Sequence, residues 1–416
     1  MMCQQLAAVL IAVAVFQEAH AAPRHWDTTA LFEPPRTFPA PDYAQDLPEH
    51  SNPELGFTGE GVRPLFYEGL PWQGKPTRVF AWYGAPELAE GQQAPAMVLV
   101  HGGGGTAFDE WVRIWNRRGY AAIAMDVTGS GPGGAPGQRP RHAWAGPPHN
   151  GMTDIDEAIE DQWVYHAVAD VVLAHSLLRS FPEVDADRIG LTGISWGGFL
   201  TCLVSAVDPR FRFAVPVYGC GFLNEGPVWG PTWQKLGAER TAEWHALWDP
   251  ASYVAATAMP TLWVNGSNDR HFPLSIHGKT VAQCGGPRTL SVRVGMSHSH
   301  VHGWKPDEIY VYADGLVRGG PPLAKVVEEG RTGDTAWVRF EAPVPVTQSE
   351  LVHTSDLSDW VACPWQGAPA QLDEDGGRAT ATVPPGCRAY FFNLTDERGL
   401  VVSTNRTVVP DQKGSG

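Results

Sequence analysis

The residues with the clearest chemical potential surround Ser195, in the stretch Gly193-Ile194-Ser195-Trp196-Gly197. An apolar, strand-like run precedes this serine, and the run at 198–204 has helical character. A serine on a sharp turn between strand and helix exposes its Oγ above the sheet, and the flanking glycines let the two elements approach closely. The amides at the start of the helix would face the negative charge that develops when the serine attacks a carbonyl. The stretch therefore predicts a nucleophilic serine.

A nucleophilic serine needs a base and an acidic group that orients the base. Asp269 follows the apolar run 260–264 and is the predicted acid. Asp249 is the alternative acid, but the proline that follows it favours a helix-capping role.

Three histidines compete for the role of base, at the end of the strand-like run 289–294. His298 is the first past the strand and is the predicted base, with His300 as the runner-up and His302 expected at the solvent-exposed surface. Alternation along a strand would place all three imidazoles on one face, which suggests a metal site. Because no fourth ligand is evident nearby, we predict no metal and no cofactor.

An oxyanion site needs two backbone N–H groups near the nucleophile. The apolar run 96–100 ends at His101, and four glycines follow at 102–105. We expect the two donors to be the amides of Gly103 and Trp196. Each such donor stabilises the transition state by about 3–4 kcal/mol in enzymes where one has been removed.

The elements that must position these residues alternate between strand and helix patterns. Strand-like runs lie at 77–83, 96–100, 121–125, 213–218, 260–264 and 289–294, and helical patterns at 107–118 and 157–180. This alternation predicts an α/β fold with a mostly parallel sheet and helices on both faces. The Gly- and Pro-rich loop at 128–153 follows a buried strand, so it should border the active site.

The two ends of the chain differ in character from this middle part. Leu6 to Phe16 form a short apolar run before Ala19-His20-Ala21, a pattern typical of a secretory signal peptide. Short alternating runs at 336–341, 358–362, 379–383, 388–393 and 400–404 predict a C-terminal antiparallel β-sandwich without catalytic residues. The predicted organisation is a signal peptide at 1–21, an N-terminal arm at 22–75, a catalytic domain at 76–318 and a sandwich module at 319–416. We expect a secreted or periplasmic protein.

Composition limits the partners. A net charge of −15 over 416 residues argues against nucleic acid and against a membrane surface as partners. Cys363 and Cys387 lie in strand-like runs and could pair in an oxidising compartment. Cys202 and Cys220 are expected to be buried free thiols.

The motifs, taken in order, resemble a known superfamily. HGGGG at 101–105, Asp126 after a strand, GISWGG at 193–198, SNDRHFP at 267–273 and MSHSHVHGW at 296–304 resemble the α/β-hydrolases. More narrowly, residues 75–318 look like the secreted bacterial group of acetylxylan esterases, dienelactone hydrolases and prolyl-oligopeptidase-like enzymes. The resemblance implies a triad of Ser195, Asp269 and a histidine within 298–300. Dienelactone hydrolases use a cysteine nucleophile, so the serine here argues against dienelactone as substrate.

The segment 220–250 is too long for a simple connection and should cap the active site. We expect its Trp229 and Trp233, together with His271, to contact the substrate, and Arg139, Arg141 and Trp144 lie on loops that could reach the pocket. The favoured function is a serine carboxylic ester hydrolase acting on a small-molecule or polysaccharide ester, such as acetylated xylan.

Two other functions are weighed. A serine peptidase of the prolyl-oligopeptidase type is disfavoured because the chain has no room for a propeller. A non-catalytic binding protein on a hydrolase fold is disfavoured by the complete serine, aspartate and histidine set.

Overall fold

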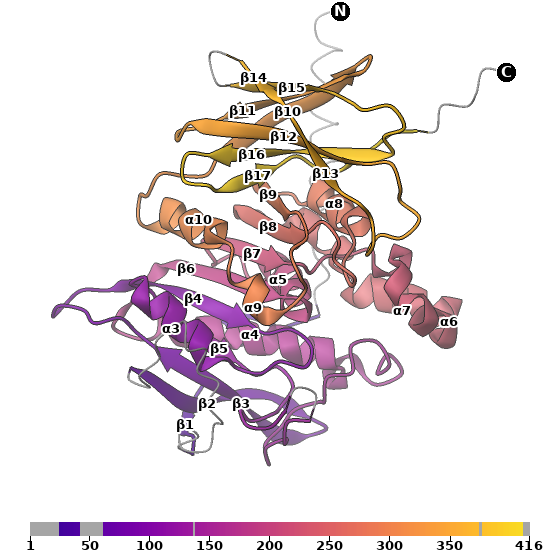
Figure 1. Cartoon of the computed structure of the whole chain (residues 1–416). Helices are drawn as coiled ribbons and strands as arrows, with labels where there is room; N and C mark the ends of the chain where they lie inside the picture. Colours follow the sequence, from indigo (N-terminus) through magenta and orange to yellow (C-terminus); the bar gives the residue numbers. More distant parts are fainter. Residues whose placement is uncertain (1–24, 42–60, 136–137, 374–376, 411–416) are drawn as a thin grey trace, which may run out of the picture.

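The structure is a computed structural model that describes residues 25–41, 61–135, 138–373 and 377–410. The predicted signal segment at 1–21 lies outside these ranges and stays a prediction. Figure 1 shows one large sheet flanked by helices, and further sheets formed by the C-terminal part of the chain. None of the described helices combines the length and the apolar character needed to cross a membrane.

The large sheet has nine strands in the order β1-β2-β3-β5-β4-β6-β7-β8-β9. Strands β4 to β9 run parallel, and β3, β2 and β1 extend the sheet by antiparallel pairing. The predicted mostly parallel sheet is therefore confirmed. The strands are Thr37–Pro39 (β1), Val62–Trp72 (β2), Lys75–Gly84 (β3), Ala94–Val100 (β4), Ala121–Met125 (β5), Val184–Ile194 (β6), Phe213–Val217 (β7), Thr261–Gly266 (β8) and Arg288–Arg293 (β9).

Helices cover both faces of this sheet. The connection β4–α3–β5 crosses the sheet in one direction, whereas β5–α4–β6 and β6–α5–β7 cross it in the other. Because such connections are right-handed, α3 lies on one face and α4 and α5 on the opposite face. Tyr310 of α10 packs on Trp115 of α3 with ring centroids 4.9 Å apart, so these two helices share a face. The helices are Asp109–Arg117 (α3), Trp163–Arg179 (α4), Trp196–Val207 (α5) and Asp307–Val317 (α10).

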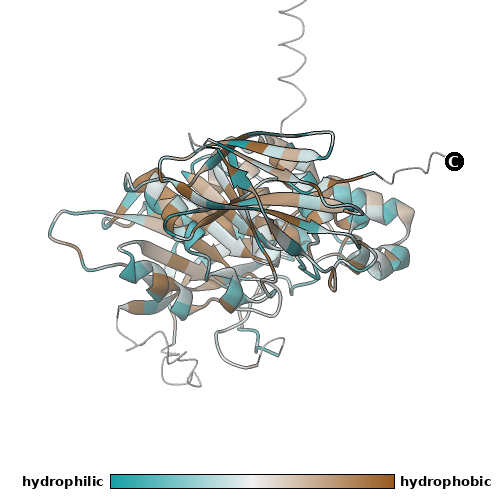
Figure 2. Ribbon diagram, turned by 45° about the horizontal axis from the view of Figure 1, so that its top comes forward, coloured by the Kyte–Doolittle hydropathy of each residue, from teal (hydrophilic) through white to brown (hydrophobic). Residues whose placement is uncertain are grey.

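The central strands are apolar along their whole length because both of their faces are covered. Every residue of β4, β5, β7 and β8 is buried. Figure 2 shows hydrophobic segments concentrated in the interior of the molecule, with hydrophilic ones toward its edges. The continuous apolar runs in the sequence therefore predicted these strands well.

The sheet begins earlier in the chain than the predicted boundary at residue 76. Strands β2 and β3 form a hairpin whose turn residues Gln73 and Gly74 have φ values of 49° and 73°. Positive φ at both positions is the geometry of a tight two-residue hairpin turn. Pro64 and Pro71 within β2 hid the strand pattern, since proline cannot donate to a β-ladder. Residues 62–75, assigned to an N-terminal arm, belong to the sheet.

Two insertions follow parallel strands at their carboxyl ends. The loop at 128–153 follows β5, and the Asp126 carboxylate accepts hydrogen bonds from the amides of Thr128 and Ser130 at 2.9 and 2.8 Å. The segment after β7 folds into a helical cap, whose α6 and α7 project from the side of the molecule in Figure 1. Its helices are Leu223–Glu225 (η4), Pro227–Trp229 (η5), Gly230–Leu236 (α6) and Ala238–Trp248 (α7).

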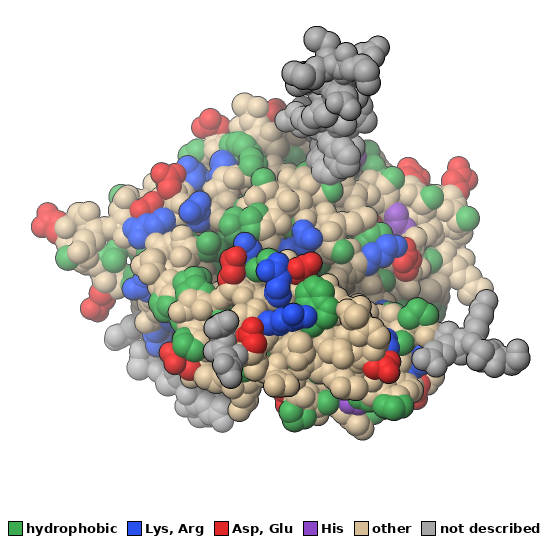
Figure 3. All heavy atoms as spheres, turned by 90° about the horizontal axis from the view of Figure 1, so that it is seen from above, with side chains coloured by type: hydrophobic (Ala, Val, Ile, Leu, Met, Phe, Trp, Pro, Cys, Tyr) green, Lys and Arg blue, Asp and Glu red, His purple; other side chains and the backbone are tan. Residues whose placement is uncertain are grey.

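The C-terminal part forms two antiparallel sheets, as predicted, with the orders β10-β11-β15-β14 and β13-β12-β16-β17. On the face seen in Figure 3, acidic and basic side chains are interspersed. The strands are Lys325–Thr332 (β10), Thr335–Glu341 (β11), Val346–Thr354 (β12), Gln366–Pro369 (β13), Gln371–Leu372 (β14), Arg378–Thr382 (β15), Ala389–Asp396 (β16), Val401–Ser403 (β17) and Thr407–Val408 (β18).

One predicted C-terminal strand is wrong, and five of the described strands were not predicted. Residues 358–362 form a loop, because the Asp359 carboxylate accepts hydrogen bonds from the amides of Val361 and Ala362 at 2.8 and 3.2 Å. The missed strands are β10, β12, β13, β14 and β18. Most residues of β10 are exposed, so it lacks the alternation that marks a half-buried strand.

The cysteines of the described ranges are all free, so the suggested Cys363–Cys387 disulfide is not formed. The Cys363 thiol donates to the carbonyl oxygen of Asp356 at 3.1 Å, and that of Cys387 to Ala389 at 3.3 Å. Cys202 and Cys220 are buried free thiols, as predicted.

Glycines allow the strand β6 and the helix α5 to meet at a very short distance. A Cβ added to Gly193 would lie 2.1 Å from the carbonyl oxygen of Gly197, and one added to Gly197 would lie 2.0 Å from that of Val100. Both obstacles are backbone atoms, which no side-chain rotation can remove.

We expect Gly193→Ala to lower the free energy of unfolding by about 1–3 kcal/mol or more, because the added methyl group forces the backbone apart. Gly230→Ala is the matched control, since nothing lies within 4 Å of the Cβ it would add. The control should change stability by less than about 1 kcal/mol. Urea unfolding of both variants measures the difference, and equal stabilities would contradict the packing argument.

Candidate active site

Ser195 lies on the turn between β6 and α5 with φ 61° and ψ −116°. Few non-glycine residues adopt such a conformation, and it persists only where the surroundings enforce it. Here the Ser195 amide donates to the carbonyl of Val217 in β7, and its own carbonyl accepts from the Phe199 amide, both at 2.9 Å. The turn is therefore held by the neighbouring strand and by the helix that follows.

The structure brings Ser195, His298 and Asp269 together in one hydrogen-bonded line. His298 Nε2 lies 2.9 Å from Ser195 Oγ, and His298 Nδ1 lies 2.6 Å from Asp269 Oδ2. The arrangement requires the tautomer with hydrogen on Nδ1, which donates to the carboxylate, so that Nε2 accepts from the serine hydroxyl. These residues follow the carboxyl ends of β6, β8 and β9. The three strands lie close together in the sheet, where the order is β6-β7-β8-β9.

The candidate acid, Asp269, is buried, and both of its carboxylate oxygens have hydrogen-bond partners. Asp269 is 1% exposed, and its Oδ1 accepts from the amides of His271 and Phe272 at 2.8 and 2.7 Å. The alternative acid, Asp249, accepts from the amides of Phe222, Leu223 and Ala251. Asp249 therefore has the predicted capping role, and it is not part of the Ser195 line.

Aromatic contacts hold His298 in place. The Tyr218 ring lies 4.3 Å from the His298 ring, and the Tyr218 hydroxyl donates to the Ser297 carbonyl at 2.8 Å. The His271 ring packs edge-on against the His298 ring, with centroids 4.7 Å apart. Sequence reasoning missed Tyr218, although its position directly after β7 was a usable signal.

His300 occupies a different environment from His298. It begins the short helix His300–Gly303 (α9), and its Nε2 accepts a hydrogen bond from the Gly102 amide at 2.9 Å. Burial lowers the pKa of His300 to about 3. The runner-up base therefore faces the glycine loop and stays neutral.

The suggested alternation of three imidazoles along a strand is wrong, because His300 and His302 lie in α9. His302 is exposed, as predicted, and its Nδ1 lies 2.8 Å from Ser299 Oγ. Within the part of the chain that the structure describes, no three His, Cys, Asp or Glu residues are grouped so as to hold a metal ion.

The glycine loop lies directly against the nucleophile turn. A Cβ on Gly102 would be 2.8 Å from the Ser195 Cβ, and one on Gly103 would be 2.9 Å from Cδ1 of Trp196. The Trp196 amide belongs to the first turn of α5, where amides have no acceptor within the helix. The glycine loop therefore packs against the turn formed by Ser195 and Trp196, and the oxyanion roles of the Gly103 and Trp196 amides stay a prediction.

The two tryptophans of the cap that were expected to contact the substrate, Trp229 and Trp233, lie in different surroundings. Trp229 is half-buried, with its ring 5.5 Å from Trp196 and 6.3 Å from His271. Trp233 was expected to contact substrate, but its indole N–H donates to the Leu223 carbonyl at 3.0 Å and its ring packs on Trp244. Trp233 belongs to a buried core of the cap, and this position cannot offer a free face to a ligand.

The long loop reaches the site, as predicted. His149 packs edge-on against Trp196, with ring centroids 5.4 Å apart. Arg141 donates to the carbonyl of Thr128, and Trp144 packs under the Arg78 guanidinium, so neither points to Ser195. Arg139 lines a pocket beside the site.

The loop at 358–363, between strands of the C-terminal sheets, forms hydrogen bonds with the loop that carries Asp269. The Asn268 side-chain amide donates to the carbonyls of Val361 and Cys363 at 3.0 and 2.8 Å. On the other side of Asp269, the Trp360 indole donates to the Arg270 carbonyl at 3.3 Å. The acid is thus flanked on both sides by contacts to residues about ninety positions away.

We expect Asn268→Ala to loosen the acid loop, because both hydrogen bonds of its amide are lost. Amide hydrogen exchange should become faster at His271 and Phe272, whose N–H groups donate to Asp269. Ser358→Ala is the control in the same C-terminal loop, since Ser358 is exposed. Unchanged exchange in Asn268→Ala would show that the C-terminal contacts do not hold the acid.

The lowered pKa of His300 makes the stability of the fold depend on pH. Folded His300 stays neutral down to about pH 3, whereas a histidine in the unfolded chain binds a proton below about pH 6.5. The unfolded state thus takes up more protons, and this contribution to stability is lost as the pH falls from about 6.5 toward 3. His300→Gln should therefore lose less stability than the wild type between pH 7 and pH 4 in chemical unfolding. His302→Gln, at an exposed position, should follow the wild type.

Two family models match overlapping parts of the chain. The model of the acetyl xylan esterase family matches residues 62–225, and that of the prolyl oligopeptidase family matches residues 153–314. The first match contains the glycine loop and Ser195. The second contains Ser195, Asp269 and His298.

Curated relatives share limited identity. An uncharacterized peptidase, YuxL, of Bacillus subtilis is 26% identical over 211 residues, which cover 47% of this chain and 29% of the relative. Dipeptidyl-peptidase 5 of Porphyromonas gingivalis is 26% identical over 201 residues, covering 44% and 27%. The chain therefore spans less than a third of the length of these relatives.

Solved structures share the fold. An acetyl xylan esterase from Paenibacillus sp. R4 superposes with a TM-score of 0.54 at 19% identity, covering 72% of this chain and 98% of that one. Acetyl xylan esterase 1 from Thermoanaerobacterium sp. JW/SL YS485 gives 0.53 at 21% identity, covering 71% and 95%. Together with the strand order and the serine turn, these matches show that the chain has the α/β-hydrolase fold.

Proposed function

We propose that the protein is a serine hydrolase that cleaves carboxylic esters, with Ser195 as nucleophile, His298 as base and Asp269 as orienting acid. The observation that supports this most strongly is the line of hydrogen bonds from Ser195 Oγ to His298 at 2.9 Å and on to Asp269 at 2.6 Å. Nucleophile, base and orienter at these separations make up the arrangement that activates a serine hydroxyl.

In the first half of the reaction, Ser195 Oγ attacks the ester carbonyl carbon while its proton passes to His298 Nε2. The buried Asp269 carboxylate stabilises the imidazolium that forms, because it accepts the Nδ1 hydrogen. The amides of Gly103 and Trp196 donate to the oxyanion. The carbon–oxygen bond to the alcohol then breaks, and the alcohol oxygen takes the proton from His298.

In the second half, the acyl group is transferred to water. His298 Nε2 removes a proton from water, which attacks the acyl-enzyme through a second tetrahedral oxyanion. Collapse of this intermediate releases the carboxylic acid, and the proton on His298 returns to Ser195 Oγ. Every step uses residues already in place, and no metal or cofactor enters the balance.

We propose an acylated carbohydrate as the substrate, as in the family whose model covers the glycine loop and Ser195. The second candidate is a serine peptidase, which the prolyl oligopeptidase match over residues 153–314 favours. Both activities use the same three residues, so the difference lies in the leaving group. Export by the segment at 1–21 and the division into catalytic and C-terminal domains remain part of this proposal.

We expect Ser195→Ala and His298→Ala each to lower kcat on an acetyl ester by about 10⁴-fold or more, because each removes one member of the activated pair. His300→Ala should lower kcat far less, by under about 100-fold, because His300 bonds to the glycine loop rather than to the serine. Steady-state rates of the variants on acetylated sugars identify which histidine is the base. Comparison with the rate on a peptidyl-prolyl amide measures the preference between an alcohol and an amine leaving group.

Two other outcomes would contradict these assignments. Near-native turnover in His298→Ala with loss in His300→Ala would assign the base to His300. A higher kcat/KM on the amide than on every ester would favour the peptidase. Circular dichroism of each variant shows whether it is folded, so that a loss of activity can be distinguished from a loss of structure.

A further inference from the structure

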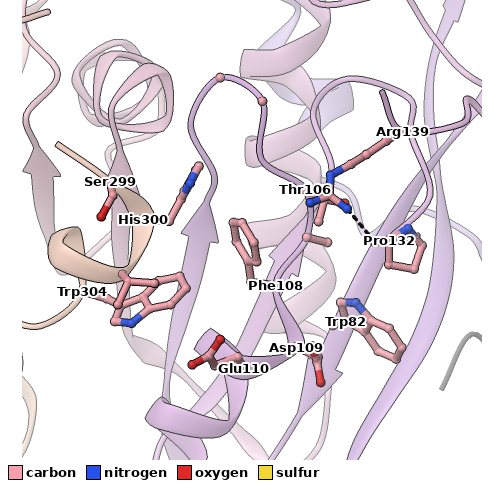
Figure 4. A pocket seen from close by; sticks show the side chains of 14 residues that line it. Trp82, Thr106, Phe108, Asp109, Glu110, Pro132, Arg139, Ser299, His300 and Trp304 are labelled. Atoms are coloured by element: carbon pink, nitrogen blue, oxygen red, sulfur yellow. Dashed lines mark hydrogen bonds between the residues drawn. The ribbon is translucent and has the colours of Figure 1, made fainter. Parts of the chain in front are cut away.

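A pocket of ≈ 520 Å³ lies beside the serine site, on the far side of the glycine loop. Its walls carry three aromatic residues, Trp82 of β3, Phe108 before α3 and Trp304 after α9 (Figure 4). Gly103 lines the pocket, and the neighbouring Gly102 sits between Ser195 and His300. A Cβ on Gly102 would lie 2.8 Å from the Ser195 Cβ and 3.2 Å from Nε2 of His300, a residue that lines the pocket, so the pocket and the serine lie close together.

The pocket contains polar atoms that the fold leaves unused. Trp82 Nε1, Glu110 Oε1 and Arg139 Nε are buried and have no hydrogen-bond partner among the described residues, and all three side chains line the pocket. His300 adds a donor, because its Nε2 accepts from Gly102 and the neutral ring must carry hydrogen on Nδ1. Buried polar atoms are nearly always paired, so a group of unpaired ones around one cavity indicates a ligand that pairs them.

The mixture of groups restricts the chemistry of that ligand. A hydrocarbon chain would suit the aromatic walls but would leave the donors of Trp82 and Arg139 unpaired. A cation would meet the Arg139 guanidinium, and an anion would meet the carboxyl groups of Asp109 and Glu110. A neutral ring with several hydroxyl groups satisfies the whole set, because hydroxyls both donate and accept while the ring face lies on an aromatic wall.

Glu110 is suited to such a ligand. Burial, together with the neighbouring Asp109, raises the pKa of Glu110 to about 7. Near neutral pH its carboxyl is therefore present in both forms, and it can donate a hydrogen bond to a hydroxyl as well as accept one.

The position of the pocket relative to His298 indicates which part of the ester enters it. The leaving oxygen must lie against His298 Nε2 to receive its proton. The three residues that follow His298, namely Ser299, His300 and Val301, all line the pocket. The segment that directly follows the proposed base therefore forms one wall of the pocket.

We propose that this pocket binds the alcohol part of the ester as a sugar residue, held between Trp82, Phe108 and Trp304 and hydrogen-bonded by Glu110 and Arg139. The proposal rests on the proposed ester hydrolase function. It replaces the cap residue Trp233 as the expected sugar contact.

The kinetic test compares two acetyl esters that differ only in the alcohol, ethyl acetate and a monoacetylated methyl glycoside. In Glu110→Leu the ratio of kcat/KM for the glycoside ester to that for ethyl acetate should fall about tenfold, the loss expected for an unmade buried hydrogen bond. Glu110→Gln, which keeps the shape and the hydrogen bonding, should retain most of the ratio. Glu90→Leu at an exposed position is the matched control and should leave the ratio unchanged.

Two results would overturn the proposal. The first is an equal loss on both esters in Glu110→Leu. The second is a changed preference among ethyl acetate, butanoate and hexanoate without a changed preference among alcohols, which would assign the pocket to the acyl group.

A binding test separates this proposal from the proposed catalysis. Calorimetric titration of Ser195→Ala with the free methyl glycoside should show binding, and the double variant with Glu110→Leu should lose at least tenfold in affinity. Absence of binding in Ser195→Ala would refute the sugar pocket. Binding to a protein that hydrolyses neither ester would keep the pocket and refute the esterase function.

Discussion

The close approach of three backbone segments around Ser195 is the constraint on which the rest of the structure depends. A Cβ at Gly197 would lie 2.0 Å from the Val100 carbonyl, and one at Gly219 would lie 2.0 Å from the Phe199 amide. The end of β4, the start of α5 and the end of β7 can therefore meet only through glycines. This contact brings the glycine loop against the turn that carries the serine, and it holds Ser195 in its strained conformation.

Two histidines only two positions apart illustrate how the environment assigns a role. His298 lies between a buried carboxylate and the serine hydroxyl, with aromatic rings on two sides. His300 starts a helical turn that rotates it toward the Gly102 amide, and burial lowers its pKa to about 3. One imidazole lies within hydrogen-bond distance of the serine hydroxyl, whereas the other bonds to the glycine loop and borders the neighbouring pocket.

The C-terminal sheets contribute to the site without supplying a member of the proposed triad. Their loop at 358–363 bonds to Asn268 and Arg270, on both sides of Asp269. The acid is therefore held by its own loop, through the amides of His271 and Phe272, and from outside by a distant part of the chain. This dual support accounts for the short, part-buried hydrogen bond between Asp269 and His298, which lie on separate loops.

The sequence by itself determined the fold class and the types and order of the candidate residues, because these depend on local patterns. Continuous apolar runs marked the buried parallel strands, and the glycines around Ser195 marked the turn. Residues just past the ends of parallel strands had to meet at one sheet edge, so Asp269 and a nearby histidine were predictable.

Only the tertiary structure showed that His298, and not His300, lies within hydrogen-bond distance of Ser195, because this depends on a helical turn at α9 that the alternating histidines did not reveal. It also joined β2 to the sheet through a hairpin whose prolines hid the strand, separated Trp233 from the free surface, and brought Asn268 to a loop about ninety residues away. These features depend on contacts between distant segments, which no local pattern records.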